Sequence, residues 1–315
     1  MQGGSLASRP YQRSEGMQQQ VQRLYKYWNR PSRSAYLFLA PSLILLLLFS
    51  FVPLVMAFVL SLFDVNMTMS QFSFVGLNNF AKAFQDPRFV NSLKVTGTFA
   101  AIELPIQVIG AMIIAAFLTK NSIRNRLYRA VYFLPVICSA TAIGIMWKMI
   151  LNSNIGFITY VIRILGFGKI NFLNTPKLTI FVVAFVSVWR SFGISTIIYV
   201  TAIQQIDASM FEAAQVDGAG PIRQFFGITV PAIRPTFWFI LLTRFAGALQ
   251  IFDIIYTTTN GGPNFTTEST VSYVYTRAFT AGGFMGYASA LSVVLFAIIM
   301  LVTILLYGKM NREDA

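Results

Sequence analysis

The stretch SMFEAAQVDGAGPIRQFFGITVPAIRP, residues 209–235, carries the strongest local signals in the chain. Ser209 and Glu212 have the spacing of a capping box, in which each side chain satisfies a free backbone donor at a helix start. Gly218 and Gly220 can take the left-handed conformation that ends a helix. The pattern therefore predicts a helix that begins near Ser209 and a turn that follows it.

The second half of this stretch predicts a short helix with one apolar face. Pro221 suits the first turn of a helix, because its missing N–H is not needed there. Four apolar side chains then recur with helical spacing: Ile222, Phe225, Phe226 and Val230. Exposed aromatic side chains need a surface that buries them, which can be the lipid interface, the helix's own bundle or a partner protein.

Four apolar segments precede this loop in the sequence and two follow it. Each is long enough for a membrane-spanning helix, which needs about 20 mainly apolar residues. They are residues 35–63, 95–118, 130–151, 178–203, 236–256 and 287–307. The chain is 56% hydrophobic and 11% charged, whereas a soluble domain carries about 25% charged residues. The sequence therefore predicts an all-α integral membrane protein with six transmembrane helices. We expect a transmembrane domain at residues 35–308, with tails at 1–34 and 309–315.

The distribution of Lys and Arg predicts the orientation. These residues are concentrated in the N-terminal tail, the C-terminal tail, the loop at 204–235 and the loop after the second span, which has Lys120, Arg124, Arg126 and Arg129. The positive-inside rule places such segments in the cytoplasm. We therefore expect a multi-pass protein of the bacterial inner (plasma) membrane with both termini cytoplasmic. The same rule accounts for the net charge of +13, so we expect lipid and no nucleic acid as a partner.

Several kinds of chemistry are excluded. Histidine is absent, which removes histidine-based triads, HExxH sites and most zinc sites. Cys138 is the sole cysteine, so no intrachain disulfide can form. No GxxxxGK[ST] phosphate-binding motif occurs, so we do not expect this chain to hydrolyse ATP. We therefore predict a transport subunit without catalytic residues, metal site or bound cofactor.

The loop resembles the EAA loop of ABC-importer permeases. The residues that carry the likeness are Glu212-Ala213-Ala214, Asp217-Gly218-Ala219-Gly220, Phe225, Ile228, Pro231 and Pro235. In that family the loop docks in a cleft of the ATPase subunit as the coupling helix. The resemblance implies coupling through Glu212, Ala213, Ala214, Asp217, Gly218, Gly220, Phe225 and Phe226. Our hypothesis is that Glu212 and Asp217 fix the fold of the loop and that Phe225 or Phe226 anchors it.

The resemblance covers about residues 35–310 and is to the carbohydrate branch of the family, of the MalF type. Its further motifs are Phe74-Val-Gly-Leu-Asn-Asn-Phe80, Leu134-Pro135, Met146-Trp147, Phe252-Asp253 and Thr259-Asn-Gly-Gly-Pro263. The large extra outer domain of the maltose protein is absent. The likeness implies a type I ABC importer fold and import of a sugar or oligosaccharide. It also implies a second, MalG-like permease subunit, two ATP-binding subunits that hold ATP and Mg, and an extracytoplasmic solute-binding protein.

Charged residues within the spans indicate a pathway. Each costs about 2.5–3.5 kcal/mol on insertion scales, so it should face protein or a wet cavity. Arg190, Arg244 and Glu103 are such residues. The candidate pathway residues are Ser187, Arg190, Ser191 and Ile194 in the fourth span and Thr243, Arg244, Gly247 and Gln250 in the fifth. The resemblance implies that these faces contact sugar.

Two interpretations of the arginines stay open. They pair with Glu103 or with span-end carbonyls, or they line the pathway and favour an anionic solute. Arg suits carboxylate and phosphate because its planar fork donates two hydrogen bonds at once. The solute would then be a uronate-containing oligosaccharide or, as an alternative, glycerol-3-phosphate.

Three other classes of protein agree less well with the sequence. A secondary transporter would need inverted repeats and a self-contained coupling-ion site, and neither is found in the sequence. A membrane enzyme would need a nucleophile and base or a metal cluster. An ABC importer of amino acids or polyamines would usually have a shorter chain and another loop pattern.

Overall fold

The computed structural model describes residues 31–68, 70–280 and 283–313. The predicted tail at 1–34 lies outside the described residues as far as residue 30. The chain divides into two compact units, Met1–Met56 and Ala57–Ala315. The described part of the first unit is an apolar helix built from α2 (Pro31–Leu46), the π-helical turn η1 (Leu47–Phe51) and the start of α3 (Val52–Leu60).

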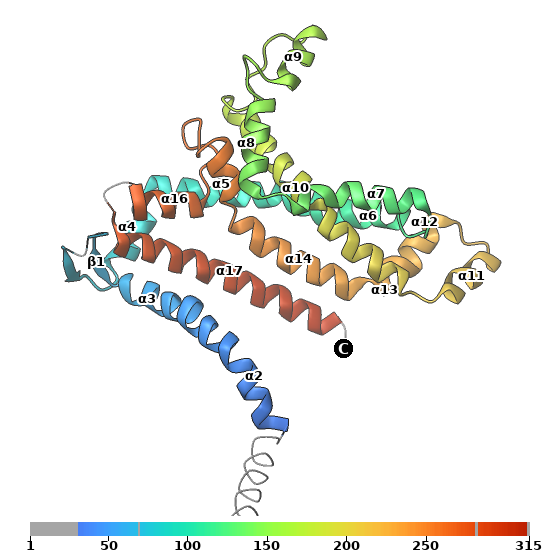
Figure 1. Ribbon diagram of the computed structural model, residues 1–315, viewed down its shortest axis with the longest axis horizontal. Helices are drawn as coiled ribbons and strands as arrows, with labels where there is room; N and C mark the ends of the chain where they lie inside the picture. The colour runs from blue at the N-terminus through green and yellow to red at the C-terminus, as the bar shows by residue number, and fades with distance from the viewer. Residues whose placement is uncertain (1–30, 69, 281–282, 314–315) are drawn as a thin grey trace, which may run out of the picture. The chain divides into compact units, whose positions relative to one another are not determined.

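The second unit begins with a small hairpin and continues as a helical bundle (Figure 1). Strands β1 (Phe63–Val65) and β2 (Phe72–Phe74) pair antiparallel, with Phe63 opposite Phe74. The next elements are α4 (Asn78–Gln85), α5 (Pro87–Pro105), η2 (Ile106–Gly110), α6 (Ala111–Phe117), α7 (Ile123–Phe133), η3 (Leu134–Ile137), α8 (Ala140–Ile150), α9 (Phe157–Ile164) and α10 (Pro176–Gln204). The sequence did not predict the hairpin, but the rest agrees with an all-α protein.

The second half of the bundle contains the loop and the last two spans. Its elements are α11 (Ala208–Val216), α12 (Pro221–Gln224), η4 (Phe225–Thr229), α13 (Val230–Ala232), α14 (Arg234–Leu249), α15 (Asp253–Thr258), α16 (Thr270–Tyr275), η5 (Thr276–Thr280) and α17 (Met285–Glu313). In Figure 1 the helices α11, α12 and α13 gather at one end of the bundle, while β1, α4 and α16 lie at the other.

Five helices in the described residues are long and apolar enough to cross a membrane. They are Phe38–Leu60, Pro87–Phe117, Pro176–Gln204, Arg234–Thr258 and Met285–Met310. A sixth span is found if the bent pair Ile123–Ile137 and Ala140–Ile150 counts as one. The predicted number of six therefore holds only with this pair included.

The third span is not the single helix that we predicted for residues 130–151. Its two parts meet at an angle of 99°. Pro135 lies in the 3₁₀ turn before the bend and supplies no N–H to a continuing helix. Ser139 then caps α8 by accepting a hydrogen bond from the Ala142 N–H at 3.1 Å. A polar capping residue inside the apolar run thus starts a new helix.

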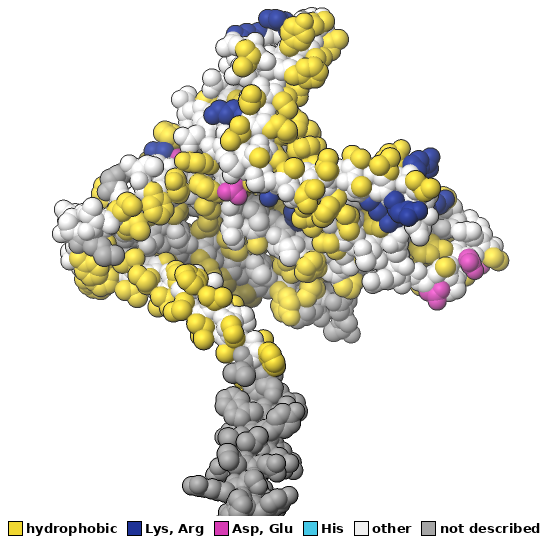
Figure 2. Space-filling view, viewed as in Figure 1, with side chains coloured by type: hydrophobic (Ala, Val, Ile, Leu, Met, Phe, Trp, Pro, Cys, Tyr) yellow, Lys and Arg dark blue, Asp and Glu magenta, His cyan; other side chains and the backbone are white. Residues whose placement is uncertain are grey.

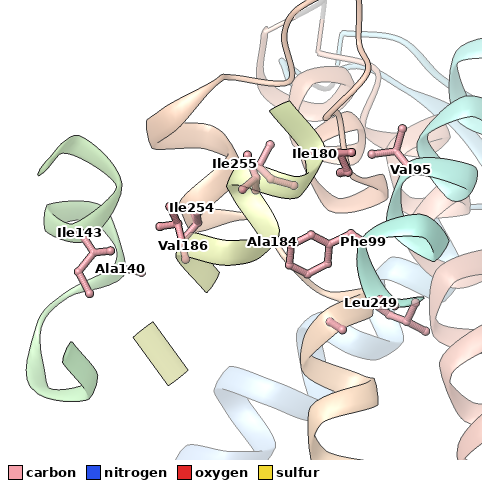
Figure 3. Packing of buried hydrophobic residues seen from close by; sticks show 13 residues of the cluster. Val95, Phe99, Ala140, Ile143, Ile180, Ala184, Val186, Leu249, Ile254 and Ile255 are labelled. Carbon is pink, nitrogen blue, oxygen red and sulfur yellow. The ribbon is translucent and has the colours of Figure 1, made fainter. Parts of the chain in front are cut away.

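Three apolar clusters hold the second unit together. One lies among α5, α8, α10, α14 and α15, and Figure 3 shows Phe99, Ala184 and Ile255 within it. A second lies among η2, α6, α10 and α14 and includes Tyr199 and Ile240. A third joins α4, α5, α16 and α17. α5, α10 and α14 each belong to at least two clusters and therefore form the centre of the bundle.

The start of α5 is tied to α16 and α17 by a polar network. Asp86 caps α5 by accepting hydrogen bonds from the backbone N–H groups of Arg88, at 2.9 Å, and Phe89. Its carboxylate also accepts hydrogen bonds from the hydroxyls of Tyr273 and Tyr287, the latter at 2.8 Å. Burial favours the neutral form of Asp86, but these hydrogen bonds outweigh it and lower its pKa below the ordinary value. Asp86 therefore stays ionised at neutral pH.

A second link fixes the loop between α15 and α16. The Arg88 guanidinium donates two hydrogen bonds of 2.7 Å to the buried carboxylate of Glu268. Such a paired geometry is the strongest form of a guanidinium–carboxylate contact. Burial and the hydrogen bond to Asp86 raise the pKa of Tyr273 to about 12, so its hydroxyl remains a donor. The loop between α15 and α16 is therefore held to the bundle at several points.

Gly193 marks a close approach of two backbones. A Cβ added there would lie 2.7 Å from the carbonyl carbon of Tyr132 and 2.9 Å from the Cα of Phe133. α10 can pass the end of α7 at this distance only because Gly193 has no side chain. Gly97, on α5, has no neighbouring heavy atom within 4 Å of such a Cβ.

We predict that Gly193→Ala destabilises the protein by about 1–3 kcal/mol, because the added methyl group overpacks two backbones. Gly97→Ala should be neutral or stabilising by up to ~1 kcal/mol, because alanine favours helix more than glycine does. Thermal unfolding in detergent would compare the two. Equal melting temperatures for both variants would contradict the packing described here.

Candidate functional site

A cavity of about 200 Å³ lies where α5, α10, α14 and α15 come together, with α8 at its edge. Its wall is formed by Glu103, Ala140, Ser187, Arg190, Ser191, Thr243, Arg244, Gly247, Ala248, Gln250, Ile251, Phe252, Asp253 and Ile254. Polar side chains form much of this wall although the surrounding spans are apolar. This combination fits a water-filled pathway inside a membrane protein.

The structure brings seven of the eight predicted pathway residues together on this wall: Ser187, Arg190, Ser191, Thr243, Arg244, Gly247 and Gln250. Ile194 is half-buried and does not line the cavity. α10 contributes only Ser187, Arg190 and Ser191, about one turn, and Ile194 lies about one turn nearer the loop at 204–235. Ile194 thus lies outside this cavity, and its place on the pathway stays a prediction.

Arg190 on α10 and Arg244 on α14 bring two guanidiniums to the wall of the cavity. Neither Arg190 nor Arg244 makes an ion pair or hydrogen bond within the described residues, and the Nε of Arg190 is buried without a partner. Arg244 lies close enough to interact electrostatically with Glu103 and Arg190. Arg244 is therefore attracted to Glu103 without a hydrogen bond to it in the described residues, and both interpretations of the arginines stay open.

Glu103 is engaged elsewhere. Its side chain is 6% exposed and accepts a hydrogen bond from Ser187 at 3.2 Å. Asp253 also lines the cavity and is exposed. Two carboxylates therefore balance the formal charge of the two arginines. Neither carboxylate forms a hydrogen bond or ion pair with a guanidinium of the cavity in the part of the chain that the structure describes.

A polar layer lies directly beside the cavity. Gln107 is fully buried and donates to Ser191 and, at 3.5 Å, to the carbonyl of Val188. It accepts a hydrogen bond from Ser195 at 3.4 Å. Sequence reasoning missed Gln107, although its position four residues after Glu103 places both on one helix face. It also missed Phe252 and Asp253 as wall residues. The face predicted for the fifth span ended at Gln250, and these two residues come after it in the sequence.

The loop at 204–235 begins differently from the prediction. The N-cap of α11 is Asp207, which accepts a hydrogen bond from the Ser209 N–H at 3.0 Å. Ser209 and Glu212 lie inside the helix and do not form a capping box. Aspartate caps a helix as well as serine does, so the helix begins two residues earlier.

The turn after α11 confirms the role of one predicted glycine and corrects the other. Gly218 has a φ of 75°. Ala219 N donates to Ala214 O at 2.8 Å and Gly218 N donates to Gln215 O at 3.0 Å, which is a Schellman motif. Gly220 is extended, with a φ of −70°, and Pro221 follows it at the first position of α12.

The hypothesis that Glu212 and Asp217 fix this fold is not supported. Their side chains are exposed and make no hydrogen bond within the described part of the chain. The loop is instead held by its backbone turn and by Gln224, whose amide donates to Ala219 O at 2.7 Å. Ala213 is exposed and Ala214 half-buried, so the surface of α11 stays free.

The four predicted apolar residues do not share one face. Phe225 and Val230 pack against the bundle of the chain itself, whereas Ile222 and Phe226 are 76% and 66% exposed. The π-helical turn η4 begins at Phe225 and rotates the following positions relative to an α-helix. Ile222 and Phe226 border a shallow surface hollow with Gly220, Pro221, Arg223 and Gly227. Phe226 is therefore the exposed aromatic ring of the loop, and Phe225 is an internal one.

Charged side chains mark this end of the bundle. Figure 2 shows Lys and Arg gathered over the start of α7 and Asp and Glu over α11. The exposed basic residues there are Lys120, Arg124 and Arg126. Arg129 is used internally, because it donates to the carbonyls of Leu118 and Thr119 that end α6.

We predict that the cavity is wet. In a Cys138→Ser background, Thr243→Cys should react with a small charged thiol reagent roughly tenfold faster than Ala184→Cys, because thiol reactivity requires access to water. Ala184 is the control, since it is 0% exposed on α10. The measurement is the labelling rate in membranes. Similar rates at the two positions would show that the cavity is closed to solvent.

Comparison with known proteins agrees with this architecture. Residues 104–312 match the family described as "Binding-protein-dependent transport system inner membrane component". The trehalose/maltose transport system permease protein MalF of Thermococcus litoralis is 29% identical over 283 residues, which cover 90% of this chain and 95% of that protein. The sn-glycerol-3-phosphate transport system permease protein UgpA of Yersinia pestis is 30% identical over 241 residues, covering 76% and 81%.

A solved structure shares the fold. It is a bacterial ABC transporter involved in the import of the acidic polysaccharide alginate, with a TM-score of 0.80. The sequences are 22% identical, and the match covers 92% of this chain and 99% of the other. The chain therefore belongs to the binding-protein-dependent transport system inner membrane component family and is a permease subunit with the type I ABC importer fold.

Proposed function

We propose that this permease imports an oligosaccharide with acidic groups and that the solute passes through the cavity at Arg190 and Arg244. The relatives named above transport sugars or a sugar-sized phosphate ester. The observation that carries the proposal is the pair of guanidiniums on the cavity wall, which make no hydrogen bond or ion pair within the described residues and of which the Arg190 Nε is buried without a partner. A buried donor without a partner costs about 1–3 kcal/mol, and more when it is charged. A carboxylate on the solute would remove that cost.

The remaining wall suits a sugar. Thr243, Gln250 and Asp253 offer hydroxyl, amide and carboxylate groups that can bind sugar hydroxyls. Gly247 leaves room, since a Cβ there would have no neighbour within 4 Å. A volume of about 200 Å³ accommodates part of an oligosaccharide at a time. The solute would therefore move through in successive sugar units.

The second candidate is glycerol-3-phosphate. It is favoured by the same guanidinium pair, because Arg binds phosphate as well as carboxylate, and by the likeness to UgpA. Both candidates are anionic, so the test must separate a carboxylate-bearing sugar chain from a small phosphate ester.

The energy would come from partner subunits. We propose that a second homologous permease, two ATP-binding subunits carrying ATP and Mg, and an extracytoplasmic binding protein complete the importer. The loop at 204–235 and both termini would face the cytoplasm. The exposed ring of Phe226, beside Ile222 and the hollow at Gly220, offers the ATP-binding subunit an apolar contact. Closure of the ATP-binding subunits would then shift the permease between its inward-facing and outward-facing states.

Arg190→Gln and Arg244→Gln should each lower transport of an acidic oligosaccharide about 10- to 100-fold, because each removes a charge-assisted hydrogen bond. Transport of a neutral oligosaccharide should change little. Uptake into liposomes that contain the complete importer and its binding protein measures this effect. Arg163→Gln is the matched control, since Arg163 lies on α9 away from the cavity.

Each result has a clear meaning. Loss of uronate transport alone supports the proposal. Loss of glycerol-3-phosphate transport, in an importer that moves no sugar, supports the second candidate. If the wild-type importer moves neutral sugars but no anion, and both glutamine variants keep that activity, the arginines return to a structural role.

The coupling proposal predicts different effects for the two neighbouring rings. Phe226→Asp should leave the permease folded but abolish its retention of the ATP-binding subunits, because a charge replaces an exposed apolar contact. Phe225→Asp should lower the melting temperature of the permease itself, because that ring packs inside the bundle. Co-purification and thermal unfolding measure the two effects. Normal co-purification and normal ATP-driven transport by Phe226→Asp would refute the contact.

A further inference from the structure

Four aromatic rings form a row that begins at the wall of the cavity. Phe252 lines the cavity and stacks on Tyr256, with ring centroids 5.2 Å apart and planes inclined by 23°. Tyr256 lies 5.5 Å from Tyr275, and Tyr275 lies 5.2 Å from Phe279. The row therefore joins α15 to α16 and η5. These elements are close in space but are separated in the sequence by the loop between α15 and α16.

The row extends away from the loop at 204–235. α14 starts beside that loop at Arg234, and the cavity residue Arg244 lies about 15 Å along this helix at 1.5 Å per residue. α15 follows the end of α14, so Tyr256 lies beyond the cavity. The side chains of Tyr256 and Phe279 are 45% and 51% exposed. Part of each ring is thus free for a ligand.

Hydrogen bonds fix the elements that carry the row. Ser269 caps α16 and also donates to the carbonyl of Ile251 at 2.6 Å, which ties α16 to the residue before Phe252. Tyr273 lies two residues before Tyr275 and donates to Asp86. Aromatic rings on rigid supports lose little conformational entropy when they bind a ligand.

The chemistry of the row fits sugar rings. An aromatic face carries partial negative charge, which attracts the weakly positive C–H groups on the face of a pyranose ring. Two of the four residues are tyrosines, whose hydroxyls can bind sugar hydroxyls at the ring edge. Gln250 and Asp253, beside Phe252 on the cavity wall, add further polar groups. A surface that only faced lipid tails would gain nothing from these hydroxyls.

We infer that Phe252, Tyr256, Tyr275 and Phe279 form a stacking platform that receives the pyranose units of an oligosaccharide and leads them into the cavity. The inference rests on the proposed sugar import and adds a specificity element for chain length. A chain of several units would lie on the cavity and the platform at once, whereas a single unit would occupy only one of them. Longer substrates would gain affinity from the row and small solutes would not.

The test uses the complete importer with its binding protein in liposomes and compares oligosaccharides of different length. Tyr256→Ala and Phe279→Ala should each lower uptake of a tetrasaccharide about three- to tenfold, the range expected for loss of one aromatic contact. Uptake of a monosaccharide should change less than twofold. Tyr256→Phe and Phe279→Tyr keep the ring and should retain most of the rate. Phe181→Ala, an exposed ring on α10 outside the row, is the matched control.

A leucine variant separates stacking from simple apolar contact. Tyr256→Leu keeps apolar area but loses the ring face, so it should be as impaired as Tyr256→Ala. Full activity of Tyr256→Leu would show that the row only packs against lipid or protein, and the inference would be overturned. Loss of the second permease subunit on co-purification of Tyr256→Ala would also overturn it, because the row would then be a subunit contact. Equal losses on short and long substrates would do the same.

These results differ from a failure of the proposed function. If the wild-type importer moves no sugar of any length, the proposed function itself is wrong. If the wild type imports sugars and the alanine variants show no preference for length, the platform alone is wrong.

Discussion

The membrane interior offers no water to a polar side chain, and the whole bundle is arranged around this constraint. Glu103 and Gln107 on α5 and η2 find partners on α10, through Ser187 and through Ser191 and Ser195. These hydrogen bonds fix which faces of the two spans meet, because any other rotation would leave a buried carboxylate or amide without a partner. The apolar clusters on both sides then fill the remaining space. These hydrogen bonds therefore determine how α5 and η2 are aligned with α10, and the apolar packing follows from that alignment.

The same constraint explains where the spans are interrupted. Irregular backbone at membrane depth is tolerated only where it is buried in protein or lines a wet cavity. The break between α14 and α15 falls at residues 250–252, and all three of these residues line the cavity. Free backbone groups at this break can reach water or solute. The cavity therefore allows the helix to be interrupted here. The row of aromatic rings begins at Phe252, the last residue of this break.

Much of this arrangement could be predicted from the sequence, because helical periodicity places residues on faces whatever the details of packing. Periodicity in the sequence predicted the apolar segments, the loop with Gly218 and Pro221, and the helix faces that carry Arg190 and Arg244. It did not find the bend at Cys138, since one capping serine inside an apolar run gives little local signal against a continuous span. It wrongly grouped Phe225 with Phe226, because a π-helical turn changes the period on which the reasoning depended. Phe252 and Tyr275 come together only through the tertiary fold, so no spacing rule could have paired them.

The geometry also connects the loop to the cavity. The loop lies between α10 and α14, and these two helices carry both arginines of the cavity wall. Ile233 and Phe225 pack in the same apolar cluster as Tyr199 and Ile240, so the loop is attached to both helices close to their ends. A helix moves as a rigid element, and a displacement of one end is therefore carried to groups about 15 Å away. A partner that pulls on the loop would change the distance between Arg190 and Arg244 without touching either residue. Neither guanidinium forms a hydrogen bond or ion pair in the described residues, so their separation would follow these two helices, and the affinity of the cavity for an anionic group would change with it.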